Sequence, residues 1–215
     1  CAKINDRDGV FVNSGSSANL IAIAALKEKY QWGPESQIIL SPCGFATTLS
    51  AITINNLTPR FVDIEYSTLN FDLDKLEESI NSNTKAVFLS PVLGNPVDMD
   101  RLLEIFDKHK ILLCSDLCDS PFSKYNGKYL NEYSVVSTCS FYQAHLLSCM
   151  ESGIITSNDL DLIKIIRGMV NWGRNCTCVA LENLLPNGSC GKRQSTWMQD
   201  IDSELVTDHK YFFTY

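Results

Sequence analysis

Short apolar runs, typical of buried strands, alternate along the chain with longer segments in which apolar residues recur at helical spacing. The expected strands are residues 10–12, 37–40, 59–64, 84–89 and 111–117, and the expected helices between them are residues 20–30, 45–55, 73–80 and 99–109. Only a few residues connect each strand to the next helix. This order is typical of βαβ units, which build a mostly parallel sheet with helices on both faces.

The alternation changes after residue 111. Strand-like segments at 111–117, 134–141 and 153–156 follow one another before a helix over 159–170, so the topology of the sheet should change there. Beyond that helix the periodic pattern of apolar residues ends, and Gly, Asn, Cys and Pro become frequent. We therefore expect an α/β fold in residues 1–170, a three-layer αβα sandwich around a mixed, mostly parallel sheet. Residues 171–215 should form a cysteine-bearing loop extension.

The composition is that of a globular protein, since 45% of the 215 residues are apolar and 20% are charged. The net charge of -7 argues against a nucleic-acid partner and against an acidic membrane surface. The longest apolar run, residues 20–26, is far short of the roughly 20 residues that span a bilayer, and no secretion leader is visible. We therefore expect a cytoplasmic protein. The missing initial Met and the aromatic final residues lead us to expect a fragment of a longer chain.

The segment Ser14-Gly15-Ser16-Ser17 lies between an expected strand and an expected helix, where a phosphate can bind. Backbone N–H groups and the positive end of the helix dipole favour an anion there, and glycine lets the backbone approach it closely. The alternative is an ordinary serine N-cap, which uses the same residue types for the same backbone reason.

Asp116 ends an expected strand, and ligands of open α/β sheets bind at the carboxyl ends of the strands. A carboxylate there can hold a protonated ring nitrogen, because an ion pair keeps both groups charged in a partly dry site. The alternative is an aspartate that caps a loop.

Four of the nine cysteines form a candidate metal site: Cys118, Cys176, Cys178 and Cys190. Four thiolates can bind zinc or an iron–sulfur cluster. The spacing matches neither the usual zinc-finger pattern nor the commonest ferredoxin runs, so zinc, a cluster and unrelated thiols all remain open. The cysteines expected to be free thiols are Cys43, Cys114, Cys139 and Cys149.

His145 follows the strand-like segment that ends at Ser140-Phe141. A lone histidine in a loop is more often a surface residue than a catalyst. However, no lysine occurs between Lys128 and Lys164, and this absence matters in the comparison that follows.

Together these pieces resemble the DegT/DnrJ/EryC1/StrS family of sugar aminotransferases, which are pyridoxal-phosphate (PLP) enzymes of fold type I. The features that carry the resemblance are Asn-Ser-Gly-Ser-Ser-Ala-Asn at 13–19, Gly-Phe-Ala-Thr-Thr at 44–48, Gly-Asn-Pro at 94–96 with Asp98, then Asp116 and Ser140-Phe141. In the family, the Ser-Phe segment leads to the lysine that binds the cofactor covalently. Here that position is His145, which resembles the nucleotide-sugar 3-dehydratases, a branch that uses pyridoxamine 5'-phosphate (PMP).

Within this branch the cysteine pattern resembles that of the iron–sulfur members, which act on CDP-4-keto-6-deoxyglucose in 3,6-dideoxyhexose synthesis for lipopolysaccharide O-antigens. The resemblance implies a [2Fe-2S] cluster on Cys118, Cys176, Cys178 and Cys190. It also implies electrons from an NADH-dependent flavin and iron–sulfur reductase, a nucleotide-sugar substrate, a homodimer and a further C-terminal small domain. The spacer from Cys178 to Cys190 looks longer than that of the family.

The resemblance also assigns roles to the other residues. Gly15, Ser16 and Ser140 would hold the cofactor phosphate, Phe45 would stack on the ring, and Asp116 would keep the ring nitrogen protonated. Asp119 would contact the ring, and His145 would act as general base, a role suited to imidazole. Two alternatives remain: a cluster-free dehydratase or sugar aminotransferase relative, and an inactive truncated scaffold.

Overall fold

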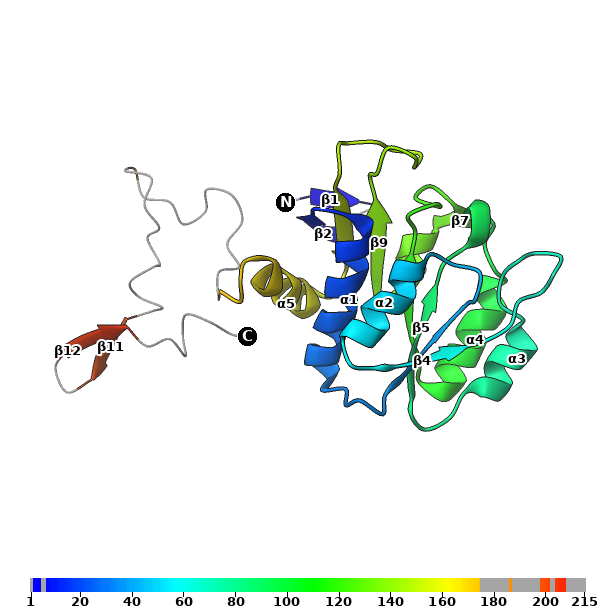
Figure 1. Cartoon of the computed structure of the whole chain (residues 1–215), viewed down its shortest axis with the longest axis horizontal. Coiled ribbons are helices and arrows are strands. Elements are labelled where there is room, and N and C mark those ends of the chain that lie inside the picture. The colour runs from blue at the N-terminus through cyan, green and yellow to red at the C-terminus, as the bar shows by residue number, and fades with distance from the viewer. Residues whose placement is uncertain (1, 5–6, 175–185, 187–197, 202–203, 208–215) are drawn as a thin grey trace.

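An eight-stranded mixed sheet organises the part of the chain that the computed structural model describes, residues 2–4, 7–174, 186, 198–201 and 204–207 (Figure 1). The strand order is β1-β2-β10-β9-β6-β5-β3-β4. The last five strands of this order run parallel to one another, while β10 is antiparallel to both neighbours and β1 is antiparallel to β2. The strands are β1 (Ala2–Ile4), β2 (Arg7–Val12), β3 (Gln37–Leu40), β4 (Thr58–Phe61), β5 (Thr84–Leu89), β6 (Leu112–Asp116), β9 (Val136–Ser140) and β10 (Gly153–Ser157).

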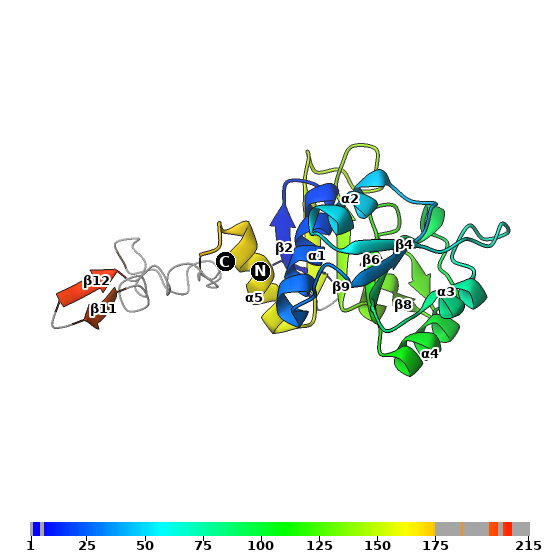
Figure 2. The ribbon, with the colours of Figure 1, turned by 60° about the horizontal axis from the view of Figure 1, so that its bottom comes forward.

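Helices cover both faces of the sheet. One face carries α1 (Gly15–Tyr30), α2 (Ala46–Ile54) and α5 (Leu160–Val170), and the other carries α3 (Leu73–Ser79) and α4 (Met99–His109). Figure 2 shows α3 and α4 across the strands from α2. Successive side chains of β3 point to opposite faces of the sheet and so contribute to both helix layers. Ile38 and Leu40 pack with α1 and α2, while Ile39 packs with α4. The predicted three-layer αβα sandwich is therefore confirmed.

The sequence pattern located most elements well, and the differences have physical causes. Strands β3 and β5 and helix α4 have the predicted residues. Helix α1 begins at Gly15, five residues earlier than the apolar run predicts, because the Ser14 side chain accepts the Ser17 N–H and caps a polar first turn.

Small elements were not predicted. Strands β7 (Lys124–Tyr125) and β8 (Lys128–Tyr129) form a hairpin around Asn126-Gly127, whose φ angles are 47° and 80°. Asn-Gly is a strong hairpin signal because both positions adopt positive φ easily. Further unpredicted elements are β1, the 3-10 turns η1 (Val92–Gly94) and η2 (Leu130–Tyr133), and an antiparallel hairpin of β11 (Met198–Ile201) and β12 (Glu204–Thr207).

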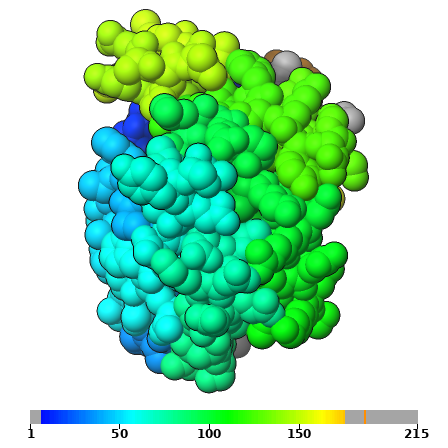
Figure 3. Space-filling model, turned by 90° about the vertical axis from the view of Figure 1, so that its right-hand side faces the viewer, coloured from blue at the N-terminus to red at the C-terminus, as the bar shows by residue number. Residues whose placement is uncertain are grey.

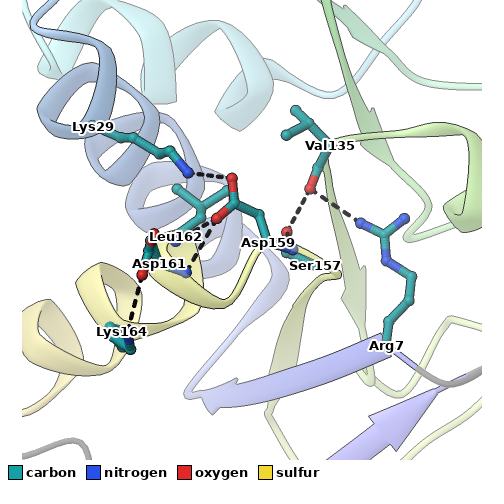
Figure 4. A network of polar contacts seen from close by, with 8 residues as sticks. All are labelled: Arg7, Lys29, Val135, Ser157, Asp159, Asp161, Leu162 and Lys164. Atoms are coloured by element: carbon teal, nitrogen blue, oxygen red, sulfur yellow. Dashed lines mark hydrogen bonds and ion pairs between the residues drawn. The ribbon is translucent and has the colours of Figure 1, made fainter.

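Polar contacts tie β2 to the segment before β9 and tie the start of α5 to α1 (Figure 4). The Arg7 side chain, 1% exposed, donates to the backbone oxygens of Ser134, Val135 and Thr156. Burial lowers its pKa to about 10, although Glu132 opposes the shift. At the start of α5, Asp159 accepts the N–H groups of Asp161 and Leu162 and pairs with Lys29 of α1.

The strand pairings of the sheet bring the ends of β2, β6 and β9 and the start of β10 to one edge. Gly153 at the start of β10 lies opposite Ser140 at the end of β9 and opposite Val12 at the end of β2. Asp116 at the end of β6 pairs with Thr138 of β9. Loops that follow parallel strands meet at this edge, which is where ligands of open α/β sheets bind. None of the helices among the described residues is long and apolar enough to cross a membrane.

Candidate functional site

A cleft of about 680 Å³ lies at the carboxyl edge of the sheet. It contains each predicted cofactor-binding or catalytic residue, together with one predicted metal ligand: Gly15, Ser16, Phe45, Asp116, Cys118, Asp119, Ser140 and His145. The segment joining β9 to β10 stands out beside it and forms the yellow-green projection at the top of Figure 3. Cys176, Cys178 and Cys190 lie outside the described residues. The structure thus brings together residues up to 130 positions apart, from Gly15 to His145.

The N-terminus of α1 forms one wall of the cleft. Gly15 and Ser16 are in the first turn of α1. The N–H groups of a first turn have no acceptor within the helix, so those of Gly15 and Ser16 can bind another group. The Ser16 hydroxyl donates to Thr47 Oγ1 at 3.1 Å, so the backbone N–H is what Ser16 offers to an anion. Ser14 is the N-cap, which means that the helix-cap interpretation holds for Ser14 without excluding an anion at the next two residues.

Glycine is required at position 15 because the chain is crowded there. A Cβ atom on Gly15 would lie 2.6 Å from Ser140 Cβ and 2.9 Å from Cys118 Sγ. Ser140 Oγ accepts the Tyr142 N–H at 3.2 Å, which leaves its hydroxyl hydrogen to donate elsewhere. The turn, the end of β9 and the loop after β6 therefore converge on one small cradle.

Asp116 forms the floor of the cleft and is 8% exposed. Its Oδ2 accepts Asn19 Nδ2 at 2.7 Å and Thr48 Oγ1 at 2.9 Å. Its Oδ1 accepts the backbone N–H of Cys118 at 3.2 Å, so Asp116 also caps its own loop. Three donors stabilise the charged carboxylate, which is what an ion pair with a protonated ring nitrogen needs.

His145 is positioned by a short turn in which its N–H donates to the Tyr142 oxygen at 2.9 Å. The two rings meet edge to face with centroids 6.1 Å apart. The imidazole Nδ1 lies 2.9 Å from Asp119 Oδ1. This contact directs Nε2 away from Asp119. The predicted contact between Asp119 and a cofactor ring stays a prediction.

Phe45 lines the cleft and is 72% exposed, so its ring is accessible to a ligand. Sequence reasoning missed Asn19, Thr48, Thr138, Tyr142 and Glu151. Asn19 and Thr48 belong to motifs that the sequence did single out, but their hydrogen bonds to Asp116 span 97 and 68 residues. The carboxylate Glu151 is a further residue that lines the cleft.

The described cysteines Cys43, Cys114, Cys118, Cys139 and Cys149 are all free thiols. Burial raises the pKa of Cys114 and of Cys139 to about 12, and the Asp116 carboxylate adds to the shift at Cys139. Burial and then Asp116 also raise the pKa of the Cys118 thiol. These groups are therefore not activated nucleophiles. Within the described residues no group of three metal-binding side chains comes together.

The cleft fits a phosphorylated pyridine cofactor. The cradle at Gly15 offers backbone N–H groups and the Ser140 hydroxyl, while the buried Asp116 carboxylate lies in the same cleft. A phosphate needs the first feature and a protonated ring nitrogen needs the second. The volume is within the range of small-molecule sites, about 300–1,000 Å³.

Comparisons with known proteins agree with this geometry. A sequence profile of the DegT/DnrJ/EryC1/StrS aminotransferase family matches residues 1–186. The dTDP-4-dehydro-2,6-dideoxy-D-glucose 3-dehydratase of Saccharopolyspora spinosa is 35% identical over 218 residues, covering 97% of this chain and 45% of the relative. The lipopolysaccharide biosynthesis protein RfbH of Salmonella typhimurium is 32% identical over 207 residues, covering 94% of this chain and 46% of the relative. The chain therefore spans about half the length of these curated relatives.

Solved structures show the same fold. A crystal structure of GDP-4-keto-6-deoxymannose-3-dehydratase with a trapped PLP-glutamate geminal diamine has a TM-score of 0.73 to this chain at 31% identity. The match covers 79% of this chain and 44% of that one. The predicted fold, that of PLP-dependent transferases of fold type I, is confirmed.

Proposed function

Because the chain belongs to the DegT/DnrJ/EryC1/StrS aminotransferase family, we propose that the full-length protein is a PMP-dependent nucleotide-sugar 3-dehydratase. The observation that carries the proposal is His145. It lines the same cleft as Asp116 and Gly15, and the family resemblance implies that it stands where the aminotransferase members have their lysine. No lysine is among the described residues that line the cleft.

The difference between histidine and lysine decides the class of reaction. A lysine amine forms a covalent bond to the cofactor, whereas an imidazole exchanges protons near neutral pH without forming that bond. With Nδ1 on Asp119, the Nε2 atom of His145 is the nitrogen available to take a proton. We therefore assign His145 as general base and Asp119 as the group that orients it.

The other cleft residues would bind and orient the cofactor. Gly15 and Ser16 N–H groups and the Ser140 hydroxyl would hold the phosphate, Phe45 would cover the ring, and Asp116 would pair with the ring nitrogen. When bound, PMP supplies the amine that condenses with the C4 ketone and a protonated ring that accepts electron density. The protein chain supplies the phosphate donors, the counter-charge and the base.

Replacing the C3 hydroxyl by hydrogen requires two electrons and two protons, and releases one water. We propose that Cys118, Cys176, Cys178 and Cys190 would hold a [2Fe-2S] cluster, which when bound would supply single electrons taken from a separate NADH-dependent flavin and iron–sulfur reductase. One observation supports this: Cys118 lines the same cleft as Asp116.

The substrate proposed is a CDP-4-keto-6-deoxyhexose, converted in the synthesis of a 3,6-dideoxyhexose for lipopolysaccharide. The relatives named above point to nucleotide-linked deoxysugars as the class. Residues 171–215, most of which lie outside the described residues, would lead to a small domain. Since no described residue lining the cleft is Lys or Arg, we propose that a second copy in a homodimer helps bind the diphosphate.

The test is anaerobic turnover of the full-length protein with PMP, NADH and a flavin and iron–sulfur reductase. CDP-, GDP- and dTDP-4-keto-6-deoxyhexoses are supplied separately and the products are weighed by mass spectrometry. The proposal predicts a sugar one oxygen atom lighter, made fastest from the CDP substrate. An amino sugar formed from glutamate would instead establish an aminotransferase. A full-length protein that neither binds PMP nor turns over substrate would be an inactive scaffold.

A further inference from the structure

A chain of buried hydrogen bonds runs from the centre of β9 to the floor of the cleft. Thr138 Oγ1 donates to Asn19 Oδ1 at 2.5 Å, and Asn19 Nδ2 donates to Asp116 Oδ2 at 2.7 Å. Thr138 and Asn19 are only 2% and 1% exposed. The chain therefore links strand β9, helix α1 and strand β6 through side chains that solvent does not screen.

The direction of these bonds follows from chemistry. An ionised carboxylate only accepts hydrogen bonds, so the NH₂ group of Asn19 must face Asp116. Its oxygen must then face Thr138, and the Thr138 hydroxyl must donate. The Ser115 oxygen, at 3.5 Å, is a more distant acceptor for the same hydroxyl. Thr138 thus fixes which end of the Asn19 amide meets the carboxylate.

The two oxygens of Asp116 have different partners. Oδ2 accepts from the side chains of Asn19 and Thr48, while Oδ1 accepts the backbone N–H of Cys118, whose side chain also interacts with the carboxylate. Thr138 does not line the cleft, whereas Asn19 does. The shorter hydrogen bond of the Thr138 hydroxyl, to Asn19, is therefore the route by which its side chain can act on a ligand.

We propose that Thr138 and Asn19 are positioning residues that hold the Asp116 carboxylate in place, aimed at the cofactor ring nitrogen. The inference rests on the proposed PMP site and extends it, through Asn19, to Thr138, which does not line the cleft. With the Thr138 hydroxyl on its oxygen, the Asn19 amide keeps its NH₂ group on Asp116 Oδ2 and so fixes the plane of the carboxylate. Without that hydroxyl, the Asn19 amide can turn its oxygen toward Asp116, and repulsion between the two oxygens should turn the carboxylate away from the ring nitrogen.

The test compares Thr138→Val, which removes the hydroxyl but keeps the shape, with Thr138→Ser, which restores a donor. The matched control is Thr156→Val. Thr156 is also buried, and its hydroxyl pairs with Ser137 Oγ at 2.7 Å, outside the chain of bonds. Full-length proteins are loaded with PMP carrying ¹⁵N in the ring. The ¹⁵N chemical shift reports the hydrogen bond between the ring nitrogen and Asp116, and a titration gives the Kd.

We expect the ¹⁵N shift of Thr138→Val to differ from that of the wild type and its Kd for PMP to rise about fivefold, the effect of one hydrogen bond. Thr138→Ser and Thr156→Val should match the wild type. An unchanged shift and Kd in Thr138→Val, or an equal change in Thr156→Val, would overturn the inference. If Thr138→Val does not fold, Thr138→Ala, which also lacks a donor, replaces it under the same criteria.

Measurements on the wild-type protein distinguish a failure of this inference from a failure of the proposed function. Failure of the wild type to bind PMP, or binding with a neutral ring, counts against the proposed site itself. Normal wild-type binding with an unaffected Thr138→Val variant counts against the positioning role alone.

Discussion

The Nδ1 atom of His145 lies 2.9 Å from Oδ1 of Asp119, three residues beyond Asp116. The His145 side chain is 22% exposed and that of Asp119 is 69% exposed. Asp119 therefore reaches the histidine from the rim of the cleft, while Asp116 forms its floor. Two carboxylates three residues apart thus face different groups: Asp119 faces the imidazole, and Asp116 faces hydroxyl, amide and backbone donors.

This contact predicts that Asp119→Ala lowers kcat for dehydration without changing the Kd for PMP. The loss should be only about three- to tenfold, because solvent screens an exposed ion pair. Asp119→Asn should lose less, since its amide oxygen can still accept the Nδ1 hydrogen. Steady-state kinetics and a cofactor titration separate the roles. A raised Kd with unchanged kcat would show that Asp119 contacts the ring instead.

The crowding at Gly15 predicts that Gly15→Ala destabilises the protein by about 1–3 kcal/mol, as overpacking does. The displaced N–H groups should also weaken PMP binding by about tenfold. Gly44→Ala is the control, because Gly44 lines the same cleft but its added Cβ would be 3.8 Å from the nearest atom, the Ser41 oxygen. Thermal unfolding and titration check both variants. Equal effects in the two would show that the cradle has no special role.

Asp159 predicts a pH-dependent contribution to stability. Burial acts to raise its pKa, but the hydrogen bonds from Lys29 and from the α5 N–H groups hold the pKa below its ordinary value. A lowered folded-state pKa means that the stabilisation is complete above about pH 5 and is lost as the carboxylate is protonated at lower pH.

Asp159→Asn should keep the helix cap but lose the Lys29 ion pair, at a cost below about 1 kcal/mol. Asp159→Ala loses both, at a cost of about 1–2 kcal/mol. Denaturant unfolding at several pH values measures these costs. A wild-type advantage over Asp159→Asn that persists unchanged below pH 3.8 would contradict the assignment.

The proposed cluster predicts about two iron atoms per chain in anaerobically purified full-length protein. Cys118→Ser should lose the iron and the dehydration activity while retaining PMP binding. The control is Cys149→Ser, which changes an exposed free thiol and should retain both. Iron and sulfide analysis decides the matter, and an iron-free protein with full dehydration activity would eliminate the cluster.

How far the sequence predicts this molecule depends on how local each signal is. The apolar pattern of Gln37–Leu40 and Met99–His109 locates β3 and α4 because burial and helix periodicity act within the segment itself. Gly15 and Asp116 were found because each lies where an expected strand ends, and such ends meet at one edge of a parallel sheet. Ser140 was predicted from the family resemblance alone.

The hydrogen-bond partners of these residues could not be predicted in the same way. Thr138 lies 119 residues from Asn19, and nothing in either segment indicates the other. Likewise, Arg7 binds backbone oxygens more than 120 residues away. Backbone oxygens occur at every position, so no sequence motif marks them. The pairing of Asp119 with His145 depends on the path of the loop after β9.

The central claim, that His145 replaces a cofactor-binding lysine as the base of a dehydratase, is tested most directly by His145→Lys. The full-length variant is incubated with PLP, reduced with borohydride and weighed by mass spectrometry, and its dehydration rate is measured with PMP. The account predicts a covalent cofactor adduct on Lys at position 145 and loss of dehydration. An unmodified protein that dehydrates its substrate at the wild-type rate would contradict it.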